Sequence, residues 1–497
     1  MTDNTIFEGV QTTPVSTVVQ PLSPVGSLPV EPIPIQNAAS TQAPSVIPLS
    51  SPPPPVSSAG SSFLTKFPLG ILLKLVISIV VLIGVSFLIF SFIIPTFFTN
   101  KNEKVTLIYW GLWEDPKVMQ SIIDDFEKEH PNITINYEQQ DVKQYRERLE
   151  TRIKNENGPD MFRFHNSWLP EISDIVAPLP SSVISPDDFK KIYYPVMQND
   201  LTKNGAIYGI PLQIDTLALF TNTDMFEAAS LQPPTNWEDF GKDARILTVK
   251  DEEGKIKTAG AALGTYDNIT HAPDILSLLF TQNGANLSNL ASTARASTDT
   301  LSYYSEYASG DSNVWDGTLD QSLLAFAKGN LAMYIGYSWD IFTIKAINPD
   351  LAFQVSPIPH LPLGRETTIA SYWVEGVSPK SKHQKEAMLF MNYLTKKETL
   401  QKMFSEASKT RPFGELYPRG DMAESLKDNL LIYPFIEQAK DATSSFFVSD
   451  TYDDGLNDKA DTYLGNAVQS ILDNTSPESA LETLSAGVSQ VLEKYGQ

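Results

Sequence analysis

The longest apolar run of the chain lies well before its globular part. Positions 75–94 read LVISIVVLIGVSFLIFSFII, 20 consecutive residues without a charge. A helix of that length crosses about 30 Å of hydrocarbon. No polar face interrupts the run and no small-residue cleavage site follows it, so the pattern predicts an uncleaved transmembrane anchor over 68–98. Two lysines flank the run on each side and leave its orientation open.

The residues before this run have a different character. Twelve of the first 60 are proline, including the run 52–55, and many of the others are Ser, Thr and Val. Such a composition cannot bury enough apolar surface to offset chain entropy. It predicts a disordered tail over 1–67 that is locally polyproline II, more simply a passive spacer than a binding segment.

From residue 105 onward, helix and strand periods alternate. Residues 105–110 form a buried strand pattern, and apolar positions spaced by four predict a helix over 116–129. Alternating apolar residues over 133–137 predict a second strand. A second helix pattern over 145–153 ends before Gly158 and Pro159. This order predicts an α/β fold with a mostly parallel sheet covered by helices.

Further helices follow later in the chain. The pattern over 387–394 predicts a helix that has Ser381 as its N-cap, and 458–495 predicts two more. The sequence Thr-Asn-Trp-Glu-Asp-Phe at 235–240 is typical of a capped helix start, so Trp237 is expected to pack in the core.

Composition excludes several kinds of chemistry. The chain has no cysteine, which rules out disulfides, thiolate metal sites, a cysteine nucleophile and a lipid carried on cysteine. Almost all of the net charge of −22 falls after residue 99. An acidic globular part repels phosphate backbones, so no nucleic-acid partner is expected.

Enzyme and cofactor motifs are missing as well. The five histidines are scattered without zinc-ligand spacing, and no phosphate-binding glycine loop follows a strand. Residues 336–340 begin like a nucleophile elbow, but Asp340 stands where that turn needs glycine. We therefore expect no catalytic residue, no metal and no cofactor. A carboxylate pair for glycan hydrolysis stays open, because 59 acidic residues offer many pairs.

The acidic stretch 450–461 resembles a calcium loop only in part. Aspartates and a glycine fall at several of the expected positions, but Tyr452 takes a ligand position and Asp461 replaces the longer bidentate Glu. A solvated acidic loop is the preferred interpretation, and calcium is the alternative.

Tryptophans follow the predicted strands at several points, and polar residues accompany them. In open α/β sheets, ligands bind beyond the carboxyl ends of the strands. A sugar offers a C–H face for an aromatic ring and a rim of hydroxyls for carboxylates and amides. This pattern predicts a sugar site built from Trp113, Glu114, Asn166, Trp168, Asp215, Trp339, Asp340 and Trp373. The alternative is that each Trp fills core, with Trp110 and Trp315 available as other cleft residues.

Five segments of 105–497 resemble the family 1 extracellular solute-binding proteins, the sugar-binding components of ABC importers that include maltose-binding protein. The segments are VTLIYWGLWED with IIDDFEKEHPNITINYE, then NGPDMFRFHNSWLPEISD, GAIYGIPLQIDTLALFTNTDMFEAASLQPPTNWEDF, FAKGNLAMYIGYSWD and YWVEGVSPKSKHQKEAMLFMNYLT. Ser167-Trp168 and Thr221-Asn222 depart from the family pattern, and the lipid-bearing cysteine is absent.

The resemblance implies a type II periplasmic-binding-protein fold and ligand contacts near Trp113, Asn166, Trp168, Asp215, Trp339 and Trp373. It implies two lobes in a solute-binding domain over 105–497, one of about 105–213 and 376–412 and the other of about 217–372 and 415–497. Crossovers near 213–217, 372–376 and 410–415 would join them.

The function implied is capture of a sugar outside the cell for an ABC permease, by a monomer held in the cell membrane through 75–94. A glycan hydrolase and a membrane-anchored sensor or adhesion module are the alternatives.

Overall fold

The computed structural model describes residues 74, 77–84, 103–361 and 364–496. The chain divides into two units, Met1–Ser86 and Phe87–Gln497. In the first unit residues 74 and 77–84 are helical. None of the helices in the described ranges is both long enough and apolar enough to cross a membrane. The predicted tail over 1–67, and most of the predicted anchor over 75–94, lie outside these ranges.

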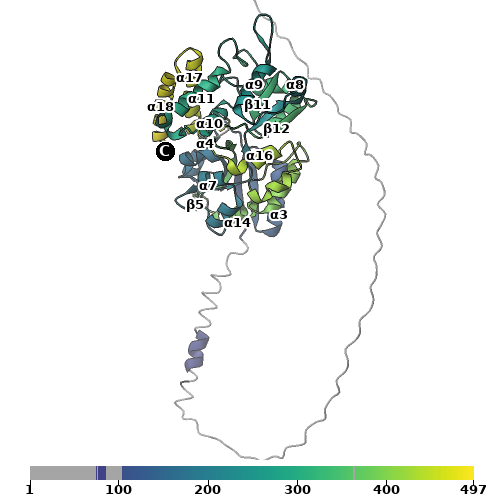
Figure 1. Ribbon diagram of the computed structural model, residues 1–497. Helices are drawn as coiled ribbons and strands as arrows, with labels where there is room; N and C mark the ends of the chain where they lie inside the picture. The colour runs from purple at the N-terminus through teal and green to yellow at the C-terminus, as the bar shows by residue number, and fades with distance from the viewer. Residues whose placement is uncertain (1–73, 75–76, 85–102, 362–363, 497) are drawn as a thin grey trace, which may run out of the picture. The chain divides into compact units, whose positions relative to one another are not determined.

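The second unit has two lobes, each built on a five-stranded sheet (Figure 1). The sheet of lobe one has the order β2 (Ile133–Gln139), β1 (Val105–Gly111), β3 (Met161–His165), β14 (Trp373–Val377) and β6 (Ile210–Pro211). Strand β1 pairs in parallel with β2 and β3, as predicted, but β14 runs antiparallel to both of its neighbours. The sheet is therefore mixed, because β14 arrives from the other lobe.

Lobe two has a mixed sheet as well. Its order is β12 (Phe353–Ser356), β8 (Ala218–Asn222), β11 (Leu331–Gly336), β10 (Ile256–Ala261) and β9 (Val249–Lys250). Only β10 and β11 run parallel to each other. The prediction of a mostly parallel sheet was thus right for β1 to β3 and wrong for the protein as a whole. Periodicity indicates a strand but not its direction, which the crossings between the lobes decide.

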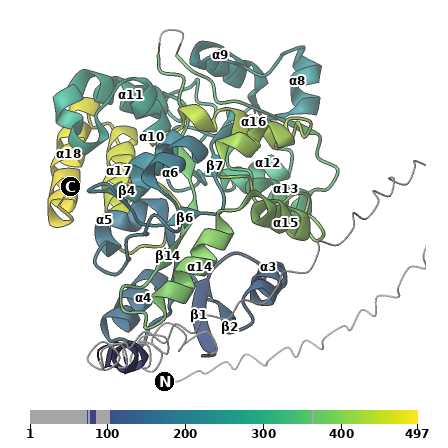
Figure 2. The same ribbon diagram turned by 90° about the horizontal axis from the view of Figure 1, so that it is seen from below.

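Helices and a small hairpin complete lobe one (Figure 2). They are α3 (Pro116–Glu129), α4 (Tyr145–Lys154), η2 (Asn166–Trp168), α5 (Leu169–Ile172), α6 (Pro186–Ile192), α7 (Pro195–Leu201), β4 (Thr202–Lys203), β5 (Ala206–Ile207), α14 (Gln384–Leu394) and α15 (Lys397–Ala407). Helix α3 begins with a proline after Asp115, whose side chain accepts from the Lys117 N–H at 2.8 Å. Its apolar stripe, including Ile122 and Phe126, is fully buried.

The remaining helices surround the sheet of lobe two or follow it. They are α8 (Thr223–Ala229), α9 (Trp237–Leu247), α10 (Ala272–Gln282), η3 (Leu287–Thr293), α11 (Ala294–Glu306), α12 (Ser322–Ala327), α13 (Asp340–Ile347), η4 (Gly420–Leu426), α16 (Tyr433–Glu437), η5 (Ala439–Asp441), α17 (Leu456–Leu472) and α18 (Pro477–Lys494). The two C-terminal helices, yellow in Figure 1, pack on each other and on α11. They confirm the prediction of two helices over 458–495.

Two predictions about helix starts have different outcomes. Asn236 caps α9 by accepting from the Asp239 N–H at 2.9 Å, and Trp237 is buried with its indole N–H donating to Gln282. The predicted packing role of Trp237 is confirmed. Ser381 is not the N-cap of α14, which begins two residues later than predicted, after His383. The Ser381 hydroxyl donates to Asp160 instead, at 2.5 Å.

A two-stranded sheet lies where the chain crosses between the lobes. Strand β7 (Asp215–Thr216) follows β6 of lobe one and precedes β8 of lobe two, and β13 (Ala370–Ser371) immediately precedes β14. The two short strands pair antiparallel, Ser371 opposite Asp215. A third segment runs alongside, since the Ile214 N–H donates to the Leu416 carbonyl at 3.1 Å. The residue boundaries predicted for the lobes stay a prediction.

A buried ion cluster holds the sheet of lobe one together. The Arg163 guanidinium on β3 is fully buried and donates through Nε to Glu375 Oε1 of β14 at 2.6 Å. It also forms an ion pair with Glu114, in the loop after β1. Three segments distant in sequence thus meet on one cation. Removing one member of such a cluster leaves the remaining charges buried without a counter-charge.

We expect Arg163→Met to lower the free energy of unfolding by about 3–5 kcal/mol, because two carboxylates would be left in the core without a cation. Urea denaturation of both proteins, followed by tryptophan fluorescence, measures the loss. The matched control is Arg245→Met, which removes an ion pair to Glu306 that is half exposed on both sides and should cost less than about 1 kcal/mol. Equal losses in the two variants would contradict the role given to Arg163.

Candidate ligand-binding site

A cavity of about 440 Å³ opens between the two lobes. Its lining comes from lobe one, from the crossing strands, from lobe two and from two late segments near 411–416 and 450–452. The residues that matter below are Trp113, Gln213, Asp215, Thr270, His271, Ser338, Trp339, Asp340, Phe342, Ser371, Trp373, Arg411, Glu415, Asp450 and Tyr452.

Lobe one contributes an aromatic wall. Trp113 is 46% exposed, and its ring centroid lies 5.7 Å from that of Trp373 in an edge-to-face arrangement. Trp373, at the start of β14, is only 7% exposed. Trp168 is fully buried behind it, edge-to-face at 5.4 Å. The Tyr452 ring extends the wall, with its centroid 6.5 Å from that of Trp113. The free surface of this wall is therefore mainly that of Trp113 and of Tyr452, which is 41% exposed.

The facing wall belongs to lobe two. Trp339 lies between β11 and α13 and stacks on Tyr337, with centroids 4.3 Å apart and ring planes 19° from parallel. The Tyr337 hydroxyl donates to Asp274 Oδ1 at 2.6 Å, which fixes the ring. Because Tyr337 covers one face of the indole, the other face is the one that a ligand can stack against.

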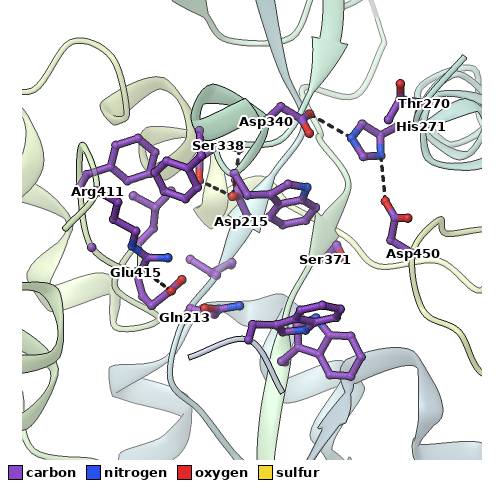
Figure 3. A pocket seen from close by; sticks show the side chains of 18 of the residues that line it. Gln213, Asp215, Thr270, His271, Ser338, Asp340, Ser371, Arg411, Glu415 and Asp450 are labelled. Carbon is purple, nitrogen blue, oxygen red and sulfur yellow. Dashed lines mark hydrogen bonds and ion pairs between the residues drawn. The ribbon is translucent and has the colours of Figure 1, made fainter. Parts of the chain in front are cut away.

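Asp215 projects from the crossing strand β7 into the cavity (Figure 3). Its Oδ2 accepts from the backbone N–H and the hydroxyl of Ser338, and its Oδ1 accepts from the Thr216 N–H at 2.8 Å. Burial raises the pKa of Asp215 to about 8, although these hydrogen bonds favour the charged form. The carboxyl links the crossing to lobe two through Ser338.

Asp340, in the first turn of α13, belongs to a chain of polar groups on the wall of lobe two. Its Oδ2 accepts from His271 Nε2 at 3.0 Å, from the Tyr334 hydroxyl at 2.8 Å and from the Tyr337 N–H at 3.0 Å. All three bonds go to one oxygen, which leaves Oδ1 for a ligand. Asp340 is thus oriented by the protein, and its Oδ1 can accept a hydrogen bond from a ligand.

His271 stands between two carboxylates (Figure 3). Its Nδ1 lies 3.7 Å from Asp450 Oδ2 and 2.9 Å from the Ser449 hydroxyl, on the side opposite Asp340. Burial lowers the pKa of His271, but the charge of Asp340 and its hydrogen bond outweigh burial and raise the pKa to about 9. The imidazole is therefore a cation at neutral pH and balances the acidic wall.

A second cation lies at the other end of the cavity. Arg411 forms an ion pair with Glu415, and its guanidinium sits 5.0 Å from the centroid of the Phe342 ring. None of these residues was predicted as a site residue from the sequence, and neither were His271, Ser338 and Tyr452. The predicted crossover near 410–415 was a usable signal for Arg411 and Glu415. No signal in the sequence pointed to His271, which lies 69 residues from Asp340.

Five of the eight predicted site residues line the cavity: Trp113, Asp215, Trp339, Asp340 and Trp373. The other three do not. Glu114 turns into the core and pairs with Arg163, and Trp168 packs behind Trp373. Asn166 donates to Asp200 Oδ2 at 2.9 Å and accepts from the Tyr372 N–H at 3.2 Å.

Asn166 lines a separate hollow of about 420 Å³. Asp200 is bonded there to Asn166, to the Tyr372 hydroxyl and to Ser444. Burial raises the pKa of Asp200 to about 6. This group joins elements of both lobes.

No group of three or more histidine and acidic side chains that could hold a metal ion gathers in the ranges that the structure describes. The acidic stretch 450–461 is not the solvated loop predicted from sequence. Asp453 is fully buried, and Asp458 and Asp461 lie on α17 rather than in a loop.

His271 should keep its proton far above the ordinary range of histidine. Its stabilising contribution is fully present below about pH 6.5 and is lost as the pH rises through about 9, because the folded-state pKa is the raised one. NMR titration of the histidine ring protons measures this. His165, whose pKa burial lowers to about 3, is the internal control and should stay neutral throughout. A midpoint near 6.5 for His271 would contradict the ion pair with Asp340.

Comparison with known proteins places this geometry in a family. The family model of bacterial extracellular solute-binding proteins matches residues 110–401. The multiple sugar-binding protein of Streptococcus mutans serotype c is 24% identical over 322 residues, which cover 61% of this chain and 74% of that protein.

Solved structures share the fold. A cyclo/maltodextrin-binding protein complexed with maltotetraose superposes with a TM-score of 0.64 at 19% identity, covering 78% of this chain and 97% of the other. The GacH receptor of Streptomyces glaucescens, solved unliganded and with acarbose, superposes with a TM-score of 0.61 at 20% identity, covering 79% of this chain and 99% of the other. Such identities show likeness of fold alone.

These comparisons confirm the resemblance found in the sequence and the two-lobed α/β fold. The relatives are binding proteins, which confirms the prediction that the chain is not an enzyme. The chain belongs to the family of bacterial extracellular solute-binding proteins.

Proposed function

We propose that the chain binds a sugar or oligosaccharide outside the cell and delivers it to an ABC-type permease. The observation that carries this proposal is the cavity between the lobes, which has tryptophan faces on both walls and carboxylates between them. Aromatic faces suit the C–H surfaces of a sugar ring, and oriented carboxylates suit its hydroxyls. Relatives named for sugars, maltotetraose and acarbose support the choice of ligand.

In this proposal the predicted residues have two kinds of role. Trp113, Trp339 and Trp373 stack on the ligand, and Asp215 and Asp340 accept from its hydroxyls. The others, Glu114, Asn166 and Trp168, act from behind the wall by fixing the elements that carry the stacking residues.

The lobes would close on the ligand by bending at the crossing strands β7 and β13. Each strand is two residues long, so few backbone hydrogen bonds resist rotation there. Because each lobe supplies one aromatic wall, a sandwiched ligand favours the closed arrangement over the open one.

We expect Trp339→Ala and Trp373→Ala each to weaken sugar binding by roughly 2–4 kcal/mol. Trp339 loses stacking and buried area, and the loss of the largely buried Trp373 also removes the ring against which Trp113 packs. Isothermal titration calorimetry gives the affinities, starting with maltotetraose in a panel of neutral oligosaccharides. Trp237→Ala is the matched control, since Trp237 is buried far from the cavity lining and its loss should lower stability alone. The site is misassigned if the Trp339 and Trp373 variants bind as tightly as the parent. Failure of every sugar in the panel to bind would overturn the proposed ligand.

Anchoring is a further part of the proposal. The uncharged run over 75–94 would hold the protein in the cell membrane, with 105–497 outside and acting as a monomer beside its permease. Protease added to intact cells should then digest the large domain and spare residues before the run. Protection of the large domain in intact cells, with digestion after lysis, would contradict this topology.

A further inference from the structure

Residues 449–457, here called the strap, pass from one lobe to the other and back. The start of the strap is held on lobe two, where the Ser449 N–H donates to Asp274 Oδ2 at 2.8 Å. Just before it, the Phe447 carbonyl accepts from the Ser277 hydroxyl at 2.9 Å. Its end enters α17, which packs against α18 and α11. Both ends therefore move with lobe two.

The middle of the strap is gripped by lobe one. Arg146 of α4 donates through Nε to the Asp453 carbonyl at 2.6 Å. Glu171 of α5 accepts from the Leu456 N–H at 3.2 Å through Oε2, and the Ser167 hydroxyl donates to Asn457 at 3.2 Å. These bonds join residues about 290 or more positions apart. They exist only while the lobes stand as they do in this structure.

Gly455 of the strap lies in close contact with Glu171 and Arg146 of lobe one. A Cβ placed on this residue would lie 2.0 Å from Glu171 Oε2 and 3.1 Å from Arg146 Nη2. The Glu171 side chain is fully buried and lies beside the Asp453 carboxyl, which helps to raise its pKa. A methyl group at this point would force the Glu171 carboxyl to move away from the strap.

The strap also supplies part of the cavity. Asp450 and Tyr452 line it, and the Tyr452 ring extends the aromatic wall beside Trp113. Both residues have positive φ, 59° and 53°, and Asp454 follows with 49°. Such conformations cost free energy for residues other than glycine and persist where the surroundings impose them. The contacts of Arg146 and Glu171 with the strap are those surroundings.

We propose that Arg146 and Glu171 are positioning residues that hold the strap on lobe one, and so keep Tyr452 and Asp450 in the cavity and the two lobes in the arrangement seen in this structure. The role of the cavity in ligand capture rests on the proposed function. The fastening of the lobes does not, and can be measured without any ligand.

Protonation should control this fastening. Burial, together with the hydrogen bond and charge of Asp453, raises the pKa of Glu171 to about 9 while the strap is seated. An exposed Glu171 would titrate near its ordinary 4.5. The seated strap thus keeps a proton that the released strap gives up. Its stability is fully present below about pH 4.5 and is lost as the pH rises through about 9.

Other titratable or charged groups lie on the elements packed around Glu171. They are Arg146 and Glu150 from α4, His165 from β3, Asp453 and Asp454 from the strap, and Asp458, Lys459 and Asp461 from α17. Burial and the charge of Asp453 raise the pKa of Asp458 to about 6, so a comparison made between pH 7 and pH 10 avoids its titration.

The absence of native cysteine makes an interlobe distance directly measurable. Spin labels on Arg152→Cys of α4 and Ser489→Cys of α18, both exposed, report the lobe separation in the full chain in detergent by double electron–electron resonance. We expect one short distance at pH 7 and a longer second population at pH 10. Glu171→Gln, which keeps a neutral donor, should hold the short distance at both pH values. A parent distance independent of pH would overturn the proposal.

Equal opening of the Glu171→Gln protein at pH 10 would also overturn it, because the loss of the Asp215 or the His271 proton would then explain the change. Gly455→Ala supplies a test at constant pH. It should open the lobes at pH 7 and weaken maltotetraose binding at least about fivefold. Gly317→Ala, at an exposed glycine with open space around its Cβ position, should do neither. Thermal melts confirm that each variant is folded.

An unchanged interlobe distance in folded Gly455→Ala protein would refute the proposal that the strap fastens the lobes. Absence of sugar binding in the parent, with the distance changes as expected, would refute the proposed ligand alone.

Discussion

The ion cluster of Arg163 with Glu114 and Glu375 is the interaction on which the candidate site depends. Strand β14 enters lobe one from the crossing and carries Trp373 at its first residue, while Trp113 lies in the loop that follows β1. Arg163 ties both segments down, through Glu375 on one and Glu114 on the other. A buried cation is a costly way to join two strands, because its desolvation must be offset by both carboxylates. Because a planar guanidinium donates hydrogen bonds along fixed directions, Arg163 also fixes how the two segments are oriented.

The two aspartates of the cavity are oriented by protein donors. In Asp340 all donors converge on Oδ2, which leaves Oδ1 as an acceptor. In Asp215 the donors come from the crossing strand and from Ser338 of lobe two. A group fixed in this way loses little conformational entropy when it meets a ligand.

Local periodicity was sufficient to predict the elements at the start of the domain. The strand and helix patterns over 105–153 correspond closely to β1, α3, β2 and α4, because each buries one regular face. The same reasoning could not assign strand direction in β14, nor see that Ser381 bonds to Asp160 rather than capping α14. Both depend on where a distant part of the chain lies.

The candidate site shows the same limit. Adjacent residues in the loop after β1 point to opposite sides, so Trp113 reaches the cavity while Glu114 turns to Arg163. Residue type favoured both equally. His271 and Arg146 act through partners 69 and 307 positions away, and such pairings are set by the tertiary fold rather than by any local pattern.

The position of Asp215 on the crossing strand has a kinetic consequence. In the proposed closure the lobes turn about the crossing strands, so Asp215 would lie near the rotation axis and move little. Trp113 and Tyr452, which are 46% and 41% exposed, lie outside the crossing strands and would move more. A ligand would then meet Asp215 before the lobes come together and would contact Trp113 and Tyr452 only afterwards. In the proposed function the rate of capture is therefore set near the axis, and the residence time of the ligand is set by the contacts that form last.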